Sequence, residues 1–132
     1  MPLSDIYILQ YLVQNTEAAS DPICWQEART GGAFFAEISG VRVEIAEAHS
    51  STGSVLYVTF ARGPEQVQIV EPRPALFSRK YRDEDERRLA ELLRMLTRLI
   101  ARQCTRRRLH LIESADELKQ QIFHRLVFGA EG

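Results

Sequence analysis

The stretch from Leu89 to Cys104, LAELLRMLTRLIARQC, decides the fold of this 132-residue chain. Its apolar side chains recur at the spacing of a helix and form one stripe: Leu92, Leu93, Leu96, Leu99, Ile100 and Cys104. Four acidic residues, Asp83-Glu84-Asp85-Glu86, precede it, and the helix dipole stabilises carboxylates at a helix start. We predict a helix over residues 83–107 whose apolar face covers a sheet.

The residues before this helix predict the sheet. Short apolar runs between turn residues fill residues 23–71, a pattern typical of an antiparallel meander. We expect five strands, at Ile23–Ala28, Ala33–Ser39, Val41–Ala48, Val55–Ala61 and Val67–Glu71. The expected turns are Thr30-Gly31-Gly32, Ser39-Gly40, His49 to Ser54, and Arg62 to Gln66. Because apolar and polar residues alternate, one face of the sheet should be buried and the other partly exposed.

A shorter helix is expected over residues 4–19. Ser4 is a capping residue, and the apolar side of the helix consists of Ile6, Leu9, Leu12 and Val13. A strand from Ile6 to Val13 is the alternative, but Asp5 before it and Glu17-Ala18-Ala19 after it favour the helix. Pro22 ends the segment, because proline lacks a backbone donor.

A last helix is predicted over residues 115–128. Ser114 and Glu117 have the spacing of a capping box, and Gly129 supplies the stop. Its apolar stripe contains Leu118, Ile122, Phe123 and Leu126. The preceding helix, at residues 83–107, would be roughly 37 Å long. A domain of this size is only about that wide, so the distal end of that helix should bend or project.

Length and composition bound the class of protein. A chain of 132 residues, 45% hydrophobic and 27% charged, is expected to form a single domain and not a disordered chain. The elements above predict an α+β fold over residues 1–132. No signal peptide or membrane-spanning segment is readable, so we expect a cytoplasmic protein without membrane insertion.

Few sequence motifs indicate catalysis, metal binding or ligand binding. Cys24 and Cys104 are far apart, which predicts two buried, reduced thiols. Trp25 is expected to anchor the core or an interface. The sequence lacks a phosphate-binding loop, a nucleophile elbow and histidines at ligand spacing. We therefore expect no catalytic residues, no metal and no cofactor, and we interpret the protein as a non-enzyme.

Charge is segregated along the chain. Residues 1–71 carry three arginines and nine acids, whereas residues 72–132 carry fourteen basic residues and nine acids. The predicted long helix presents a basic face of Arg94, Arg98, Arg102 and Arg106. One interpretation is a nucleic-acid or anionic-lipid surface. The favoured interpretation is a solvated face whose arginines pair with acids such as Glu37, Glu44 and Glu47, in the same or a second subunit.

The function predicted from these features is protein–protein interaction, with a second copy of the chain as the main partner. The two C-terminal helices carry more apolar surface than one face of a small sheet can cover. The candidate dimer-interface residues are Met95, Phe123, Val127 and Phe128. Nucleic-acid binding through the basic face is the alternative.

The order of these signals resembles that of small stand-alone bacterial α+β proteins of unknown function. The residues that carry the resemblance are Leu9-x-x-Leu12, Thr16, Trp25, Phe35-Ala36-Glu37-Ile38-x-Gly40-x-Arg42-Val43, Leu56-x-Val58 and Leu89-x-x-Leu92-Leu93 with Leu96. It extends over roughly residues 6–103, and the last predicted helix is additional to it. The resemblance implies the same fold and supplies no catalytic residues.

Overall fold

The computed structural model describes residues 4–29, 31–51, 53–75 and 78–129. The elements follow in the order α1 (Asp5–Thr16), β1 (Gln26–Glu27), β2 (Ala33–Ile38), β3 (Val41–Ser50), β4 (Gly53–Arg62), β5 (Glu65–Val70) and α2 (Glu84–Phe128). The predicted α+β class and five-stranded antiparallel sheet are confirmed.

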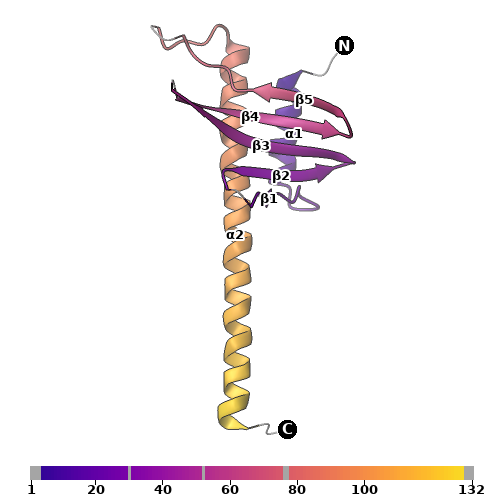
Figure 1. Ribbon diagram of the computed structural model, residues 1–132, viewed down its shortest axis with the longest axis vertical. Coiled ribbons are helices and arrows are strands. Elements are labelled where there is room, and N and C mark those ends of the chain that lie inside the picture. Colours follow the sequence, from indigo (N-terminus) through magenta and orange to yellow (C-terminus); the bar gives the residue numbers. More distant parts are fainter. Residues whose placement is uncertain (1–3, 30, 52, 76–77, 130–132) are drawn as a thin grey trace.

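The sheet is a simple meander in which each strand pairs with the next, in the order β1-β2-β3-β4-β5 (Figure 1). Ser39 and Gly40 form the predicted two-residue turn between β2 and β3, with φ angles of 51° and 79°. A tight hairpin of this kind needs positive φ at both central residues, which a glycine adopts without strain. The register that follows pairs Val43 with Ala36 on β2 and with Phe60 on β4.

Both helices lie on one face of the sheet, and the core lies between them and the strands (Figure 1). On the sheet side the core contains Val43, Ile45 and Val58. Val43 lies between an exposed and a half-buried residue as predicted, whereas Ala46 beside Ile45 and Thr59 beside Val58 are also buried. The helices contribute apolar residues to the same cluster: Leu9 and Leu12 from α1, and Leu92, Leu93, Leu96, Ile100 and Cys104 from α2. The predicted packing of the Leu89–Cys104 stripe against the sheet is therefore present.

Helix α1 is shorter than the predicted 4–19. Ser4 is its N-cap, as expected, and the Ser4 hydroxyl accepts a hydrogen bond from the Ile6 backbone N–H. The helix ends at Thr16 because the Asn15 carbonyl accepts a hydrogen bond from the N–H of Ile23, 2.9 Å away. That carbonyl is therefore engaged by the returning chain, and Glu17 forms the C-cap.

Strand β1 is also shorter than predicted, two residues instead of six. Residues 23–25 are extended, but their backbone groups bind α1 and α2 instead of β2. The prediction that both cysteines are buried is wrong for Cys24, which is exposed, and correct for Cys104. Trp25 points into the core, and neighbouring side chains of an extended segment point to opposite sides.

The β3–β4 hairpin is longer and tighter than predicted. His49 and Ser50 belong to β3, and Gly53 and Ser54 belong to β4, where a loop was expected. Ser50 pairs with Gly53, so the ladder continues almost to the turn. Residues 1–3, Thr30 and Thr52, which the predictions placed in the N-terminal segment and in two turns, lie outside the described residues.

The prediction of a separate helix at 115–128 is wrong, because α2 continues without a break through 45 residues. Its start is as predicted, with Asp83 as N-cap accepting a hydrogen bond from the Glu86 N–H. No glycine or proline occurs between Arg107 and Ser114. Extending an existing helix avoids the free-energy cost of nucleating a new one. Ser114 and Glu117 therefore lie inside α2 and do not cap the start of a separate helix. Gly129 ends the helix as predicted.

Candidate interaction site

The distal part of α2 projects away from the rest of the molecule (Figure 1). We call residues 109–128 the stalk and the remainder of the described chain the head. Every residue from Arg108 to Gly129 is exposed. At about 1.5 Å per residue the stalk is roughly 30 Å long. We predicted that the distal end of the long helix would either bend or project, and in the structure it projects.

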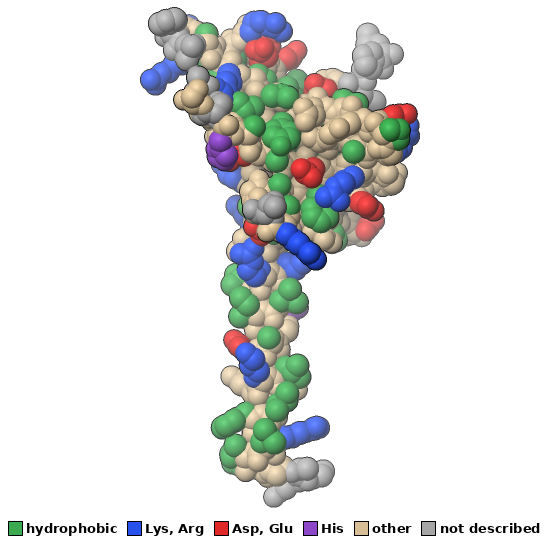
Figure 2. All heavy atoms as spheres, viewed as in Figure 1, with side chains coloured by type: hydrophobic (Ala, Val, Ile, Leu, Met, Phe, Trp, Pro, Cys, Tyr) green, Lys and Arg blue, Asp and Glu red, His purple; other side chains and the backbone are tan. Residues whose placement is uncertain are grey.

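The stalk exposes an unusual amount of apolar side chain for a surface helix (Figure 2). Nine large hydrophobic residues between Leu109 and Phe128 have exposed fractions of 52% to 79%. They are Leu109, Leu111, Ile112, Leu118, Ile122, Phe123, Leu126, Val127 and Phe128. So many exposed large apolar side chains on one helix are uncommon in a monomeric soluble protein.

These side chains are not spread evenly around the helix. At about 100° per residue, one stripe within an arc of roughly 80° contains Leu111, Ala115, Leu118, Ile122 and Leu126. We call this set the stalk stripe. The opposite side of the stalk contains the polar residues Glu113, Glu117, Gln120 and His124, with Leu109 and Val127 beside them near the two ends. The stalk is therefore an amphipathic helix without the surface that its apolar side would normally cover.

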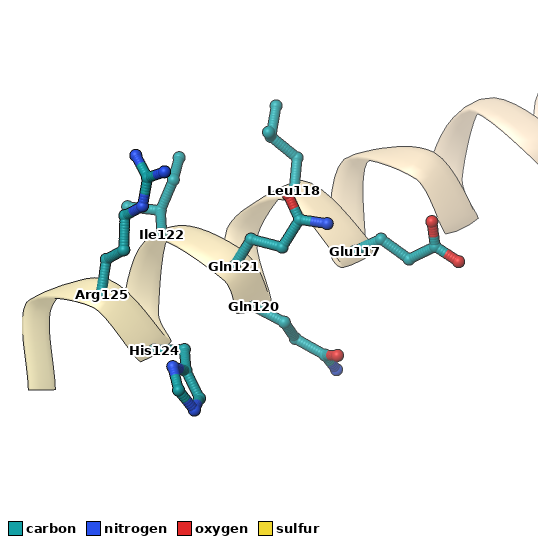
Figure 3. Close-up of a pocket in the computed structure, with 7 residues that line it drawn as sticks. All are labelled: Glu117, Leu118, Gln120, Gln121, Ile122, His124 and Arg125. Atoms are coloured by element: carbon teal, nitrogen blue, oxygen red, sulfur yellow. The ribbon is translucent and has the colours of Figure 1, made fainter. Parts of the chain in front are cut away.

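A shallow hollow on the stalk, drawn in Figure 3, does not form a ligand cavity. All seven of its lining residues belong to one helix, from Glu117 to Arg125. Their side chains point away from the helix in different directions and do not converge on a point (Figure 3). A small molecule would be contacted from one side only, whereas a second helix would cover this surface along its length.

The stalk leaves the head at a group of polar contacts centred on Gln103. The Trp25 backbone N–H donates to Gln103 Oε1 at 2.8 Å, and Gln103 Nε2 donates to the Ile23 carbonyl at 2.7 Å. One turn later, Arg107 Nη1 donates to the Trp25 carbonyl at 2.6 Å. Arg108 forms an ion pair with Glu27 of β1. These contacts fix the direction in which α2 leaves the sheet.

The four arginines of the predicted basic face differ in their contacts in the structure. Arg94 is bound to the head, since its Nε lies 2.8 Å from Glu71 Oε2, and the Glu71 side chain is only 4% exposed. Within the described residues, no carboxylate lies within ion-pair distance of the other three members, Arg98, Arg102 and Arg106.

The acids that pair with these helix arginines differ from those predicted. Glu71 binds Arg94 and Glu27 binds Arg108, whereas Glu44 approaches Arg42 on its own strand. The partners of each pair are far apart in the sequence and meet only when the sheet packs against α2. The sequence pattern therefore does not indicate which acid pairs with which arginine. Within one chain, no described ion pair joins Glu37 or Glu47 to the helix, so this part of the prediction is wrong for pairing inside the subunit.

The four candidate dimer-interface residues are not brought together. Phe123, Val127 and Phe128 are exposed on the stalk. Met95 lies on the head part of α2, about 42 Å along the helix from Phe123. The prediction also missed Leu109, Leu111 and Ile112, which were assigned to the gap between two helices. Helical spacing would have found Leu111, since it lies 11 residues, about three turns, after Ile100.

The described part of the chain contains no cluster of metal-ligating side chains. No three His, Cys, Asp or Glu side chains there are placed to bind one metal ion. Burial raises the pKa of the Cys104 thiol above its ordinary value, although Arg107 acts in the opposite direction. This shift favours the neutral, unreactive thiol. No helix in the described residues has the length and apolarity needed to cross a bilayer.

Comparison with protein-family models, curated proteins and solved structures finds no match to this chain.

Proposed function

We propose that this chain is a non-enzymatic interaction protein that associates with a second copy of itself through the stalk. One observation carries the proposal: the chain has an accessible surface of 10221 Å². A compact monomer of 15.1 kDa is expected to expose about 7,100 Å². The stalk contributes to this excess, since none of its residues is buried.

The stalk itself favours a helical partner. Most of the stability of a helix in a protein comes from packing of its apolar side, so a projecting helix gains stability when that side is covered. The stalk stripe has the narrow, continuous form of a helix-packing surface. A second stalk offers an identical stripe of equal length, and two-fold pairing of identical surfaces closes the assembly at a dimer.

Analytical ultracentrifugation tests this proposal. We expect a mass of twice 15.1 kDa for the full chain at micromolar concentration. Replacing Leu118 and Ile122 with glutamate should give a monomer that retains the circular dichroism of the head, because the charges would be buried in the paired stripe. Gln120→Glu, on the polar side of the same turn, is the matched control and should remain dimeric. A monomeric wild-type chain at high micromolar concentration would refute the proposal.

A second candidate function is nucleic-acid binding, supported by the row formed by Arg98, Arg102 and Arg106. These side chains follow one another at i, i+4 spacing, about 6 Å apart, and all three are exposed. Neutralising three phosphates of a duplex predicts a slope of about −2.7 for log affinity against log salt. Fluorescence anisotropy with a labelled duplex measures that slope, and an absence of binding at about 50 mM salt rejects this candidate.

A further inference from the structure

The side of α2 that is buried in the head is continued by the stalk stripe. Ile100 and Leu118 are 18 residues apart, which is five turns of about 3.6 residues, so their side chains point in the same direction. Cys104 and Ile122 are related in the same way. Ile100 is 0% exposed and belongs to the core beneath the sheet, whereas Leu118 is 58% exposed. The stripe thus faces the side of α2 on which the sheet lies.

The sheet ends where the stalk begins. Arg108, the last residue before the stalk, pairs with Glu27 of β1, the edge strand of the sheet. Leu126 lies five turns after Arg108 and therefore points to the same side. The head and the stalk together form a corner beside β1 (Figure 1). By helical spacing, the stalk stripe faces into this corner.

This corner excludes a parallel arrangement of two straight α2 helices. Paired helices have axes about 8–10 Å apart. In a parallel pair, both sheets would have to fit between the two α2 helices at the level of the heads. Each sheet layer needs about 10 Å, so the required separation is at least twice what the stalks allow. An antiparallel pair has no such conflict, because each stalk tip ends below the other copy's β1.

We propose that two stalks pair antiparallel, stripe to stripe, with the heads at opposite ends of the pair. This inference rests on the proposed self-association and specifies its geometry. Both stalks are about 30 Å long, so full overlap places Leu111 opposite Leu126 and Ala115 opposite Ile122 of the second copy. In this register each tip reaches the β1 edge of the other head.

Charge favours the same arrangement. Arg106, Arg107 and Arg108 form a basic cluster at the base of the stalk, in which Arg108 is paired with Glu27. A parallel pair would place the two clusters at one level, whereas the antiparallel register separates them by about 35 Å along the axis, well beyond the Debye length. Near the midpoint, Lys119 lies on the same flank as Asp116 and faces Asp116 of the second copy.

Electron–electron dipolar spectroscopy on the full chain tests the geometry. A nitroxide label at Thr105→Cys, in a Cys24→Ser and Cys104→Ala background, places one probe on each exposed helix surface near the head. The antiparallel register predicts a distance of about 40 Å between the two labels. Sedimentation of the same labelled sample shows whether it is dimeric.

The outcomes separate the two proposals. A distance near 40 Å in a dimer supports the antiparallel pair. A dimer with a distance below about 20 Å is parallel, and overturns this inference while the proposed self-association stands. A monomeric wild-type chain overturns both. Disulfide formation adds an independent check, because a Leu111→Cys, Leu126→Cys double variant should link two copies whereas either single variant should not.

Discussion

The side chain of Gln103 binds the backbone around Trp25 as a neighbouring strand would, accepting from the Trp25 N–H and donating to the Ile23 carbonyl. The residues before β1 therefore have no strand partner at this point and are held by a helix side chain. This contact couples the edge of the sheet to α2 near the base of the stalk.

Replacing Gln103 with alanine should destabilise the head. Two backbone groups would lose their partners, and leaving a buried polar group unpaired costs roughly 1–3 kcal/mol. We expect a loss of about 2 kcal/mol or more in the free energy of unfolding, measured by urea denaturation. Gln120→Ala on the polar side of the stalk is the matched control, and its change should stay within about 0.5 kcal/mol. Equal effects of the two substitutions would contradict a specific role for Gln103.

The indole of Trp25 offers a second test. Its Nε1–H donates to the Thr16 hydroxyl at 2.9 Å, and Trp25 is fully buried. Thr16→Val keeps the shape but removes the acceptor, so we expect a loss of about 1–3 kcal/mol. Thr16→Ser keeps the hydroxyl and should retain more of the stability. Fluorescence of this tryptophan, the only one in the chain, follows both transitions. A larger loss for serine than for valine would show that packing of the threonine methyl group dominates.

Arg94 and Arg98 should differ in their effect on stability although both border the same surface hollow. Arg94 neutralises the buried Glu71 carboxylate, whose other oxygen accepts from the Leu56 N–H at 3.2 Å. Because Arg94 is itself 63% exposed, solvent screening limits the expected loss for Arg94→Gln to about 1–2 kcal/mol. Arg98→Gln should change stability by less than about 0.5 kcal/mol. Thermal denaturation of the two variants side by side decides this, and equal melting temperatures would speak against the Glu71 contact.

The two thiols should react at very different rates. Cys24 is exposed and Cys104 is buried, with its pKa raised by that burial. At neutral pH a chromogenic disulfide reagent should modify one thiol rapidly, and the Cys24→Ser variant should lose this fast phase. If the fast phase survives in that variant, Cys104 is accessible and the packing at the base of the stalk differs from that described.

The raised pKa of Cys104 also predicts an alkaline dependence of stability. The unfolded chain releases this proton at a lower pH than the folded chain, so folding is favoured below the unfolded pKa and the advantage is lost as pH rises through the folded pKa. The stability difference between wild type and Cys104→Ala should therefore shrink at alkaline pH. Unfolding free energies measured across the alkaline range test this, and a constant difference would exclude the thiol as the cause.

Local patterns predicted the parts of the fold that depend on neighbours in the sequence. The Ser39-Gly40 turn, the Ser4 cap, the acidic start of α2 and the alternation around Val43 each follow from a few adjacent residues. The Ser114–Glu117 pair failed for the same reason. A capping motif stabilises a helix that begins at that position, and the sequence alone does not show that α2 already extends through it.

The amino-acid sequence by itself determined the meander, the stripe from Leu92 to Cys104 that covers it, and the presence of an apolar surplus at the carboxyl end. Only the tertiary structure decided that Ile100 is covered and Leu118 is not, although five helical turns place them on the same side. The physical reason is the width of the sheet. The edge strand β1 contacts α2 at Arg108. The helical face that is buried before Arg108 is therefore exposed after it.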